Sequence, residues 1–236
     1  MLGLGNSLLS GYTGGWFPTD EGSSLVAWYK KIKRAGYYTS NKISTWENTE
    51  GTTAYDMVQS QTVNQPTWFG DDGAVIFDGT DDFFQMTGQI TLPGAFTIGI
   101  KFAADTTGTV LLADNNTGNE MFKIMDSDTI RVKAFKTTES PNNVTANLDL
   151  SSGSFDANSY VVITRDGSGN MGFWHKGDDQ STSETLSVDY DVDIDAMGRR
   201  QGGTPNYFDG KIFDVAIFST TNSALTKQLN VHLSKL

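Results

Sequence analysis

The sequence predicts an all-β fold, in which two antiparallel sheets stack as a sandwich, with a short helix near the C-terminus and an arm at the N-terminus. Three observations predict it. Strand-like segments recur about every 8–12 residues, several end in Asp-Gly or Gly-Asn turns that suit hairpins, and helical periodicity is confined to the last residues. A chain of 236 residues is long enough for one large sandwich with a sizeable core.

The first predicted strands are short apolar segments. Residues 25–29 and 43–46 are two of them, and residues 75–84 predict a strand, a tight turn at Asp-Gly and a second strand. Residues 96–102 alternate with a period of two, which indicates a strand with one face in the core. The side chains expected on that face are Phe96, Ile98, Ile100 and Phe102.

Two hairpins are predicted in the second half of the chain. Residues 121–135 contain two alternating segments around Asp-Ser-Asp at 126–128. Residues 160–175 contain two more around Asp-Gly-Ser-Gly-Asn at 166–170, where glycine and asparagine supply positive φ without strain. In the first hairpin Arg131 and Lys133 are expected to lie on the face opposite the apolar side chains Ile130, Val132 and Ala134.

The chain ends in a long alternating strand and a helix. Residues 207–218 predict the strand, and an apolar stripe at three- and four-residue spacing predicts the helix that follows. The stripe consists of Leu225, Leu229, His232, Leu233 and Leu236. Asn222 or Thr226 is expected to cap this helix.

Residues 1–24 differ from the rest because they are rich in glycine and leucine. Glycine weakens regular structure, yet leucine and tryptophan favour burial, so this arm needs a surface to pack on. It either folds onto its own sandwich or docks on a neighbouring subunit. The residues predicted to anchor it are Leu2, Leu4, Leu8, Leu9, Trp16 and Phe17.

Composition excludes several classes of function. The formal net charge of -11 disfavours nucleic-acid binding, which needs Lys and Arg for phosphate contacts. There is no cysteine and only two histidines, which excludes disulfides and Cys- or His-rich metal sites. No long apolar segment predicts membrane insertion, and no basic, apolar leader predicts secretion.

The order of motifs over residues 25–236 resembles the laminin-G-like jelly roll of the concanavalin-A-like lectin and glucanase superfamily. The resemblance rests on the Leu-Val-Ala-Trp-Tyr entry strand at 25–29, the Phe-Asp-Gly-Thr-Asp-Asp turn at 77–82 and the closing strand at 207–218. It implies an arm at 1–24 and one jelly-roll domain at 25–236. The loop at 47–53 departs from the family pattern, which puts any family calcium or ligand role of that loop in doubt.

The opening Met-Leu-Gly-Leu-Gly-Asn-Ser-Leu at 1–8 is similar to the start of structural proteins of tailed bacteriophages, which often carry such jelly rolls. This short resemblance implies a virion protein that is assembled in the host cytoplasm with other virion proteins, as a homo-oligomer. It implies decoration of a capsid, or a place in the tail.

The sequence does not predict catalysis. Glycosidases of the concanavalin-A-like fold place two glutamates and an aspartate on one strand, as Glu-x-Asp-x-x-Glu, and this chain has no Glu-x-Asp. His232 lies on the apolar stripe of the helix, and His175 ends a strand beside charged residues, so neither is predicted to act as a base. We therefore expect no enzymatic activity and no cofactor, with calcium left open.

Two acidic segments leave calcium open. Asp189, Asp191, Asp193 and Asp195 are predicted to share one face of a strand, and the first three are the candidate calcium ligands. That face is explained by solvent exposure, by protection of an edge strand, or by a calcium site. Asp78, Asp81 and Asp82 form a second cluster, which turn formation explains first and calcium second.

Aromatic side chains provide the alternative to a purely structural role. Sugar-binding proteins stack sugar rings on tryptophan and tyrosine, and the candidates by residue type are Tyr37, Tyr38, Trp46, Trp68 and Trp174, although tryptophan is also common in sandwich cores.

The leading hypothesis is a non-enzymatic virion protein anchored by its arm. The alternative is a carbohydrate-binding module that contacts a host surface glycan, such as a receptor-binding adhesin of a virion tail, and a glycoside hydrolase ranks third.

Overall fold

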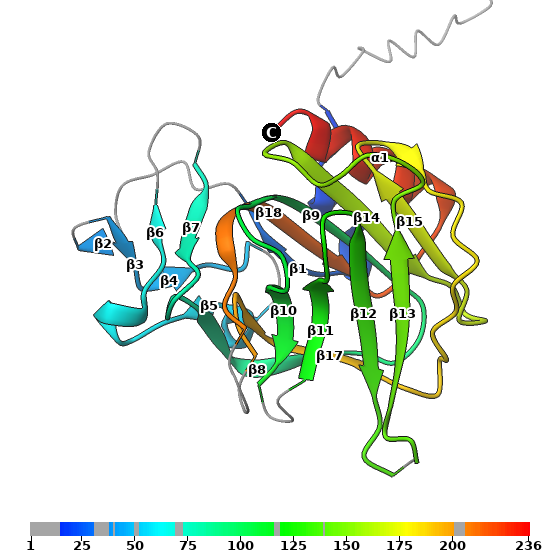
Figure 1. Ribbon diagram of the computed structural model, residues 1–236, viewed down its shortest axis with the longest axis horizontal. Coiled ribbons are helices and arrows are strands. Elements are labelled where there is room, and N and C mark those ends of the chain that lie inside the picture. The colour runs from blue at the N-terminus through cyan, green and yellow to red at the C-terminus, as the bar shows by residue number, and fades with distance from the viewer. Residues whose placement is uncertain are drawn as a thin grey trace, which may run out of the picture.

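The computed structural model describes residues 15–30, 38–39, 41–49, 52–68, 73–115, 119–138, 140–200 and 206–236. These residues form two antiparallel sheets packed face to face, with one α-helix on the outer side of the larger sheet (Figure 1). The jelly-roll sandwich with a C-terminal helix, predicted from the sequence, is confirmed.

The larger sheet contains ten strands in the described residues, and its centre is the trio β14, β9 and β18. In spatial order its strands are β16 (Asp178–Asp179), β15 (Met171–His175), β14 (Ser159–Arg165), β9 (Phe96–Ala104), β18 (Asp209–Phe218), β7 (Val75–Asp78), β6 (Thr67–Trp68), β3 (Lys42–Ile43) and β2 (Tyr38–Thr39), with β1 (Leu25–Tyr29) also paired to β18.

The smaller sheet contains eight strands in the part of the chain described. In spatial order they are β13 (Asn143–Asp149), β12 (Thr129–Phe135), β11 (Asn119–Ile124), β10 (Val110–Asp114), β17 (Val192–Met197), β8 (Phe84–Leu92), β5 (Met57–Val58) and β4 (Thr45–Trp46). The hairpin of β12 and β13 extends beyond the sandwich at its lower end (Figure 1). The described residues also form three short 3-10 helices: η1 (Pro18–Ser24) leads into β1, and η2 (Thr53–Tyr55) and η3 (Thr62–Asn64) connect strands.

The main core lies between the sheets and uses the faces that alternation predicted. Phe96, Ile98, Ile100 and Phe102 of β9 all belong to it, as do Ile130, Val132 and Ala134 of β12. The hairpins β11–β12 and β14–β15 form around the predicted turns. Strand β9 is buried on both faces because its other face lies under the helix.

In two of the predicted segments, residues 43–46 and 75–84, the chain passes from the larger sheet to the smaller sheet within a few residues. Ile43 belongs to β3 of the larger sheet and Trp46 to β4 of the smaller one, so the chain crosses between layers at Ser44. Strands β7 and β8, on either side of the turn at residues 79–83, also lie in opposite sheets. Local patterning does not reveal the crossing, since Ile43 and Trp46 both point into the core between the layers.

The prediction that four aspartates share one exposed strand face is only partly right, because the strand is shorter than predicted. Strand β17 begins at Val192, and its pairing shifts register between Ile194 and Ala196, so that Asp195 lies at an irregularity and is buried. The strand also lies between β10 and β8, which excludes protection of a sheet edge as the reason for its charges.

The helix α1 (Ser223–Ser234) covers the outer face of the larger sheet (Figure 1). The side chain of Asn222 caps it by accepting the backbone N–H of Leu225 at 2.9 Å. Leu225, Leu229 and Leu233 pack on that face in a second, smaller core. No helix among the described residues is both long and apolar enough to cross a lipid bilayer.

Close approach of α1 to the sheet depends on Gly99 of β9. A Cβ atom at this position would lie 2.7 Å from Cδ2 and 2.8 Å from Cγ of Leu229. Such contacts are far shorter than van der Waals distance, so any side chain at Gly99 would push the helix away from the sheet.

A buried polar cluster lies beneath the same helix. The indole N–H of Trp28 donates to both carboxylate oxygens of Asp214, at 3.0 and 3.1 Å. His232 of α1 lies 3.5 Å from the same carboxylate, with its ring edge-on to that of Trp28. His232 is therefore a packed residue of the helix interface, as its position on the apolar stripe predicted.

A single buried arginine joins the ends of several strands. Arg165 at the end of β14 donates to the carbonyl oxygens of Leu92 at 2.8 Å, Gly94 at 2.8 Å and Tyr190 at 2.9 Å. Its guanidinium also lies over the ring of Phe96. Five donors in a planar fork allow one side chain to satisfy several carbonyls that would otherwise be buried without partners.

We predict that Gly99→Ala lowers the free energy of unfolding by about 1–3 kcal/mol, because the added methyl group overpacks the contact with Leu229. Urea denaturation followed by circular dichroism measures this change. Gly167→Ala is the matched control, since nothing lies within 4 Å of its Cβ position. A Gly99→Ala variant as stable as the control would contradict the close packing of α1.

Candidate functional site

A groove of about 580 Å³ lies between α1 and the hairpin β14–β15. One wall is the helix with the loop before it, and the other wall is the hairpin and the turn after it. Figure 1 shows α1 beside β14 and β15. Its lining residues include Tyr160, Trp174, Thr226, Lys227, Asn230 and Val231.

The two aromatic side chains come from neighbouring strands of the predicted hairpin. Tyr160 of β14 and Trp174 of β15 are half-buried and pack against the core under α1. A Cβ atom at Gly172 would lie 2.6 Å from the six-membered ring of Trp174. The Trp174 indole therefore lies over Gly172 of the same strand, in space that any larger side chain at position 172 would occupy.

Asn230 supplies a buried polar group of the groove. It is 8% exposed, and its Nδ2 donates to the carbonyl oxygen of Thr226 at 3.0 Å. Its Oδ1 is buried and has no hydrogen-bond partner. An unsatisfied buried acceptor costs about 1–3 kcal/mol, so this atom needs a donor from water or from a ligand.

The groove carries charge at its rim. Lys227 of α1 is exposed there. Burial raises the pKa of Tyr160 above its ordinary value, and the charge of Asp178 adds to this increase. A hydrogen bond with the Ser234 hydroxyl and the charge of Lys176 oppose the increase without cancelling it. The Tyr160 phenol is therefore neutral at physiological pH and can donate and accept hydrogen bonds.

A second groove of about 430 Å³ lies on the other side of α1 and contains the two described residues of the predicted anchor. Trp16 packs against Phe218 and His232, with ring centroids 6.4 and 6.1 Å apart. Phe17 is 52% exposed. The other predicted anchor residues, Leu2, Leu4, Leu8 and Leu9, lie outside the described residues.

Of the predicted glycan-binding aromatics, Trp174 lines the groove beside α1, and the other described ones lie elsewhere. Trp46 is buried beside Tyr29 and Phe84, where its ring has no free face, so the alternative of a core residue describes it. Trp68 is half-buried against the same core. Tyr37 and the side chain of Tyr38 lie outside what the structure describes.

The structure does not bring the three predicted calcium ligands together. Asp189 lies in a turn, Asp191 pairs with Phe135 in an isolated bridge, and Asp193 is on β17. Burial raises the pKa of Asp193, the charges of Asp114 and Asp191 add to this, and a hydrogen bond from Thr91 opposes it.

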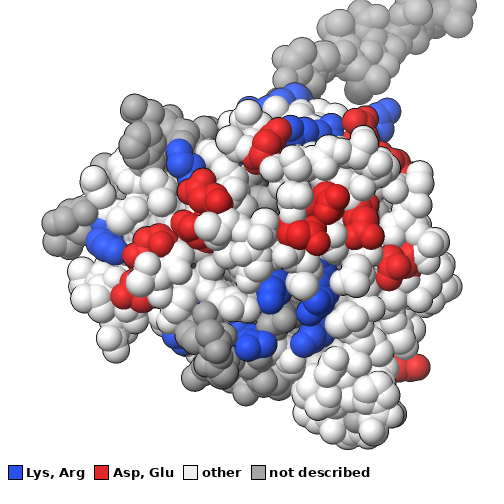
Figure 2. All heavy atoms as spheres, in the orientation of Figure 1, with Lys and Arg blue, Asp and Glu red and all other residues white. Residues whose placement is uncertain are grey.

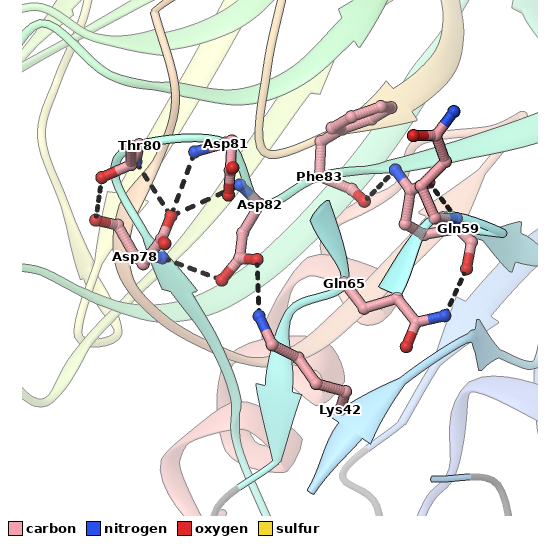
Figure 3. Close-up of polar contacts among 9 residues, drawn as sticks. Lys42, Gln59, Gln65, Asp78, Thr80, Asp81, Asp82 and Phe83 are labelled. Carbon is pink, nitrogen blue, oxygen red and sulfur yellow. Dashed lines mark hydrogen bonds and ion pairs between the residues drawn. The ribbon is translucent and has the colours of Figure 1, made fainter. Parts of the chain in front are cut away.

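Carboxylates do converge at the turn after β7 (Figure 3). One oxygen atom from each of Asp78, Asp81 and Asp82 lies within 4.8 Å of the others. Asp78 Oδ1 accepts the backbone N–H groups of Thr80 at 2.9 Å, Asp81 at 3.1 Å and Asp82 at 3.4 Å. The predicted turn chemistry is confirmed, and it already occupies Oδ1 of Asp78.

Asp82 is the buried member of this turn. It is 2% exposed, accepts the backbone N–H of Asp78 at 3.2 Å, and lies 3.4 Å from the ammonium group of Lys42. Burial, together with the charge of Asp78, raises its pKa to about 6, although Lys42 opposes the shift. Beside it, Gln59 donates to the carbonyl of Phe83 and Gln65 to that of Gln59 (Figure 3).

A serine and a histidine also meet, which the sequence did not predict. Ser159 Oγ lies 3.1 Å from His175 Nε2 and 3.4 Å from Asp156 Oδ1. Ser159 is fully buried and accepts the backbone N–H of Asp156 at 2.8 Å, so a substrate cannot reach its hydroxyl. Burial also lowers the pKa of His175. The contact ties the start of β14 to the end of β15.

The open face of the smaller sheet differs in charge from the rest of the molecule. Figure 2 shows basic side chains gathered over β11 and β12, with acidic side chains above them. Lys123 of β11 lies directly opposite Arg131 of β12, and Lys133 follows on the same strand. Lys133 also donates to the side chain of Asn119 at 3.4 Å.

No protein-family model and no curated protein sequence matches the chain. Solved structures do match most of it. One is a botulinum neurotoxin type C chain, from a study of cell entry dependent upon interaction with two ganglioside molecules, with a TM-score of 0.54 and 14% identity over 90% of this chain and 51% of that chain.

Two further structures are similar to the same extent. The binding domain of botulinum neurotoxin DC in complex with SialylT has a TM-score of 0.52 and 13% identity over 89% of this chain and 51% of that chain. The Trypanosoma rangeli sialidase in complex with 2,3-difluoro-KDN has a TM-score of 0.53 and 13% identity over 90% of this chain and 33% of that chain. At these identities the likeness shows the jelly-roll fold alone, and this chain spans about half of the toxin chains and a third of the sialidase.

We predict that Asp82→Asn changes how stability depends on pH. In the folded state Asp82 has a pKa of about 6, against an ordinary value of 3.8, so the folded state binds this proton more tightly than the unfolded chain. Its contribution to the free energy of unfolding therefore falls as the pH rises from about 4 to 6. Asp82→Asn should gain stability over the wild type across that interval, by up to about 3 kcal/mol.

Urea denaturation at pH 4 and pH 7.5 measures this difference. Asp81→Asn is the matched control, because it removes a carboxylate of the same turn and leaves the buried one in place. Parallel stability curves for the wild type and Asp82→Asn at the two pH values would contradict the prediction.

Proposed function

We propose that this chain is a carbohydrate-binding domain and that the groove between α1 and the hairpin β14–β15 is its binding site. The observation that carries the proposal is the unpartnered Asn230 Oδ1 in a groove that Trp174 and Tyr160 also line. Sugar rings stack their apolar faces on aromatic rings, and their polar groups supply hydrogen-bond donors.

The dimensions and the fold support the proposal. A volume of about 580 Å³ suits a small ligand such as one or two sugar units. The similar structures include a toxin binding domain in complex with SialylT and a sialidase in complex with a sugar acid. They support the carbohydrate-binding alternative drawn from the sequence better than the hypothesis of assembly into a virion.

A virion protein anchored by residues 1–24 remains a prediction, as do its location in a virion and its virion partners. Glycan binding is compatible with it, because a receptor-binding protein of a virion tail also needs a sugar site. The N-terminal end of the described chain lines the second groove, which shares Lys227 and Val231 of α1 with the proposed sugar site but not its aromatic residues Tyr160 and Trp174.

We predict that the full-length chain binds glycans on an array and that Trp174→Ala weakens the binding at least about tenfold, because the stacking surface is lost. Isothermal titration with the glycans that score on the array measures the affinity. Gly172→Ala should weaken binding as well, since its methyl group displaces the indole without removing it.

Phe17→Ala is the matched control, because it removes an aromatic ring from the groove on the other side of α1. It should leave the affinity unchanged. Thermal denaturation of each variant establishes that it is folded. An array without reproducible binding, or binding that survives both Trp174→Ala and Gly172→Ala, would refute the proposal.

A further inference from the structure

The helix sets the orientation of the Asn230 amide. The carbonyl oxygen of Thr226, 3.0 Å away, can only accept, so the amide nitrogen must be the atom that lies beside it. Oδ1 is therefore the atom left without a partner in the groove that Asn230 lines. A ligand that satisfies Asn230 must bring a hydrogen-bond donor.

The two helix hydroxyl groups one turn away from Asn230 in the groove, those of Thr226 and Ser234, do not meet this need. The Thr226 hydroxyl donates to the carbonyl of Asn222 at 3.1 Å. The Ser234 hydroxyl donates to the carbonyl of Val231 at 2.8 Å. Each hydroxyl has one proton to donate, so neither can also serve Asn230 Oδ1.

Two apolar side chains line the groove together with Asn230. Val231 follows it on the helix and is 45% exposed. The Trp174 indole lies on the opposite wall, held by Gly172. A small apolar group of a ligand would remove these surfaces from water, whereas another hydroxyl would need a polar partner there.

Resting on the proposed function, we infer that the groove recognises an N-acetylated sugar. The acetamido N–H donates to Asn230 Oδ1, and the acetyl methyl packs against Val231 and Trp174. In a trans amide the N–H and the acyl methyl lie on the same edge of the plane, so one group supplies both the donor and the apolar contact. A hydroxyl in the same place supplies the donor alone.

Matched sugar pairs test the inference on the full-length chain. N-acetylglucosamine is compared with glucose, N-acetylgalactosamine with galactose, and N-acetylneuraminic acid with KDN, in which a hydroxyl replaces the acetamido group. Saturation-transfer NMR and isothermal titration give the affinities and the position of the methyl group. We expect a preference of about tenfold for the acetylated member of at least one pair.

Asn230→Leu tests the role of the acceptor. Leucine keeps the volume but removes Oδ1, so the preference within the pair should be lost. Stability should be retained, because the variant also removes an unsatisfied buried group. Gln228→Leu is the matched control: its Oε1 is likewise buried without a partner, but it lines the groove on the other side of α1, so the preference should persist.

The outcomes separate the inference from the proposed function. Equal affinities within every pair, with binding still lost in Trp174→Ala, would overturn the N-acetyl inference and leave the sugar site standing. A preference that survives Asn230→Leu would also overturn it. Failure of every sugar and of the glycan array to bind the wild type would refute the sugar site and the inference together.

Discussion

The contact on which the site depends is the packing of α1 against the centre of the larger sheet. The helix approaches so closely because Gly99 leaves the space that Leu229 fills. Three leucines bury its apolar stripe, and the Asp214 cluster beneath it holds His232 in place. With the helix fixed there, a groove forms along each side of it, and the one beside β14–β15 places the Asn230 acceptor in the same groove as Tyr160 and Trp174.

This packing also makes the two outer faces of the sandwich unequal. The larger sheet is apolar on both faces at its centre, where β9 and β18 are buried almost throughout. The smaller sheet keeps the alternation of a half-exposed sheet, with Arg131 and Lys133 outward and Val132 inward. Arg165 holds the sandwich together at one end by bonding the carbonyls of several strand ends.

Features that depend on neighbouring residues could be predicted from the sequence. The hairpin around residues 166–170 and the Asn222 cap follow from turn and capping chemistry, and both formed as expected. The crossing at Ser44 and the irregularity at Asp195 could not be predicted, since each depends on a partner strand far away in sequence. The groove has the same origin: Tyr160, Trp174 and Asn230 come together only after the helix docks, and Trp174 alone was recognised as a candidate by residue type.

Gln228 and Asn230 of α1 both have a buried amide oxygen without a hydrogen-bond partner, but the two side chains differ in burial and in length. Gln228 is half-buried and has a longer side chain, so a change of rotamer brings its Oε1 to water at little cost. Asn230 is shorter, more buried and held by its bond to Thr226, so its acceptor cannot turn away without losing that bond. An apolar residue would give the helix the same packing without the cost of an unmet acceptor. A fixed acceptor without a partner, in a groove that an indole and an exposed valine also line, is best explained by a ligand that donates to it.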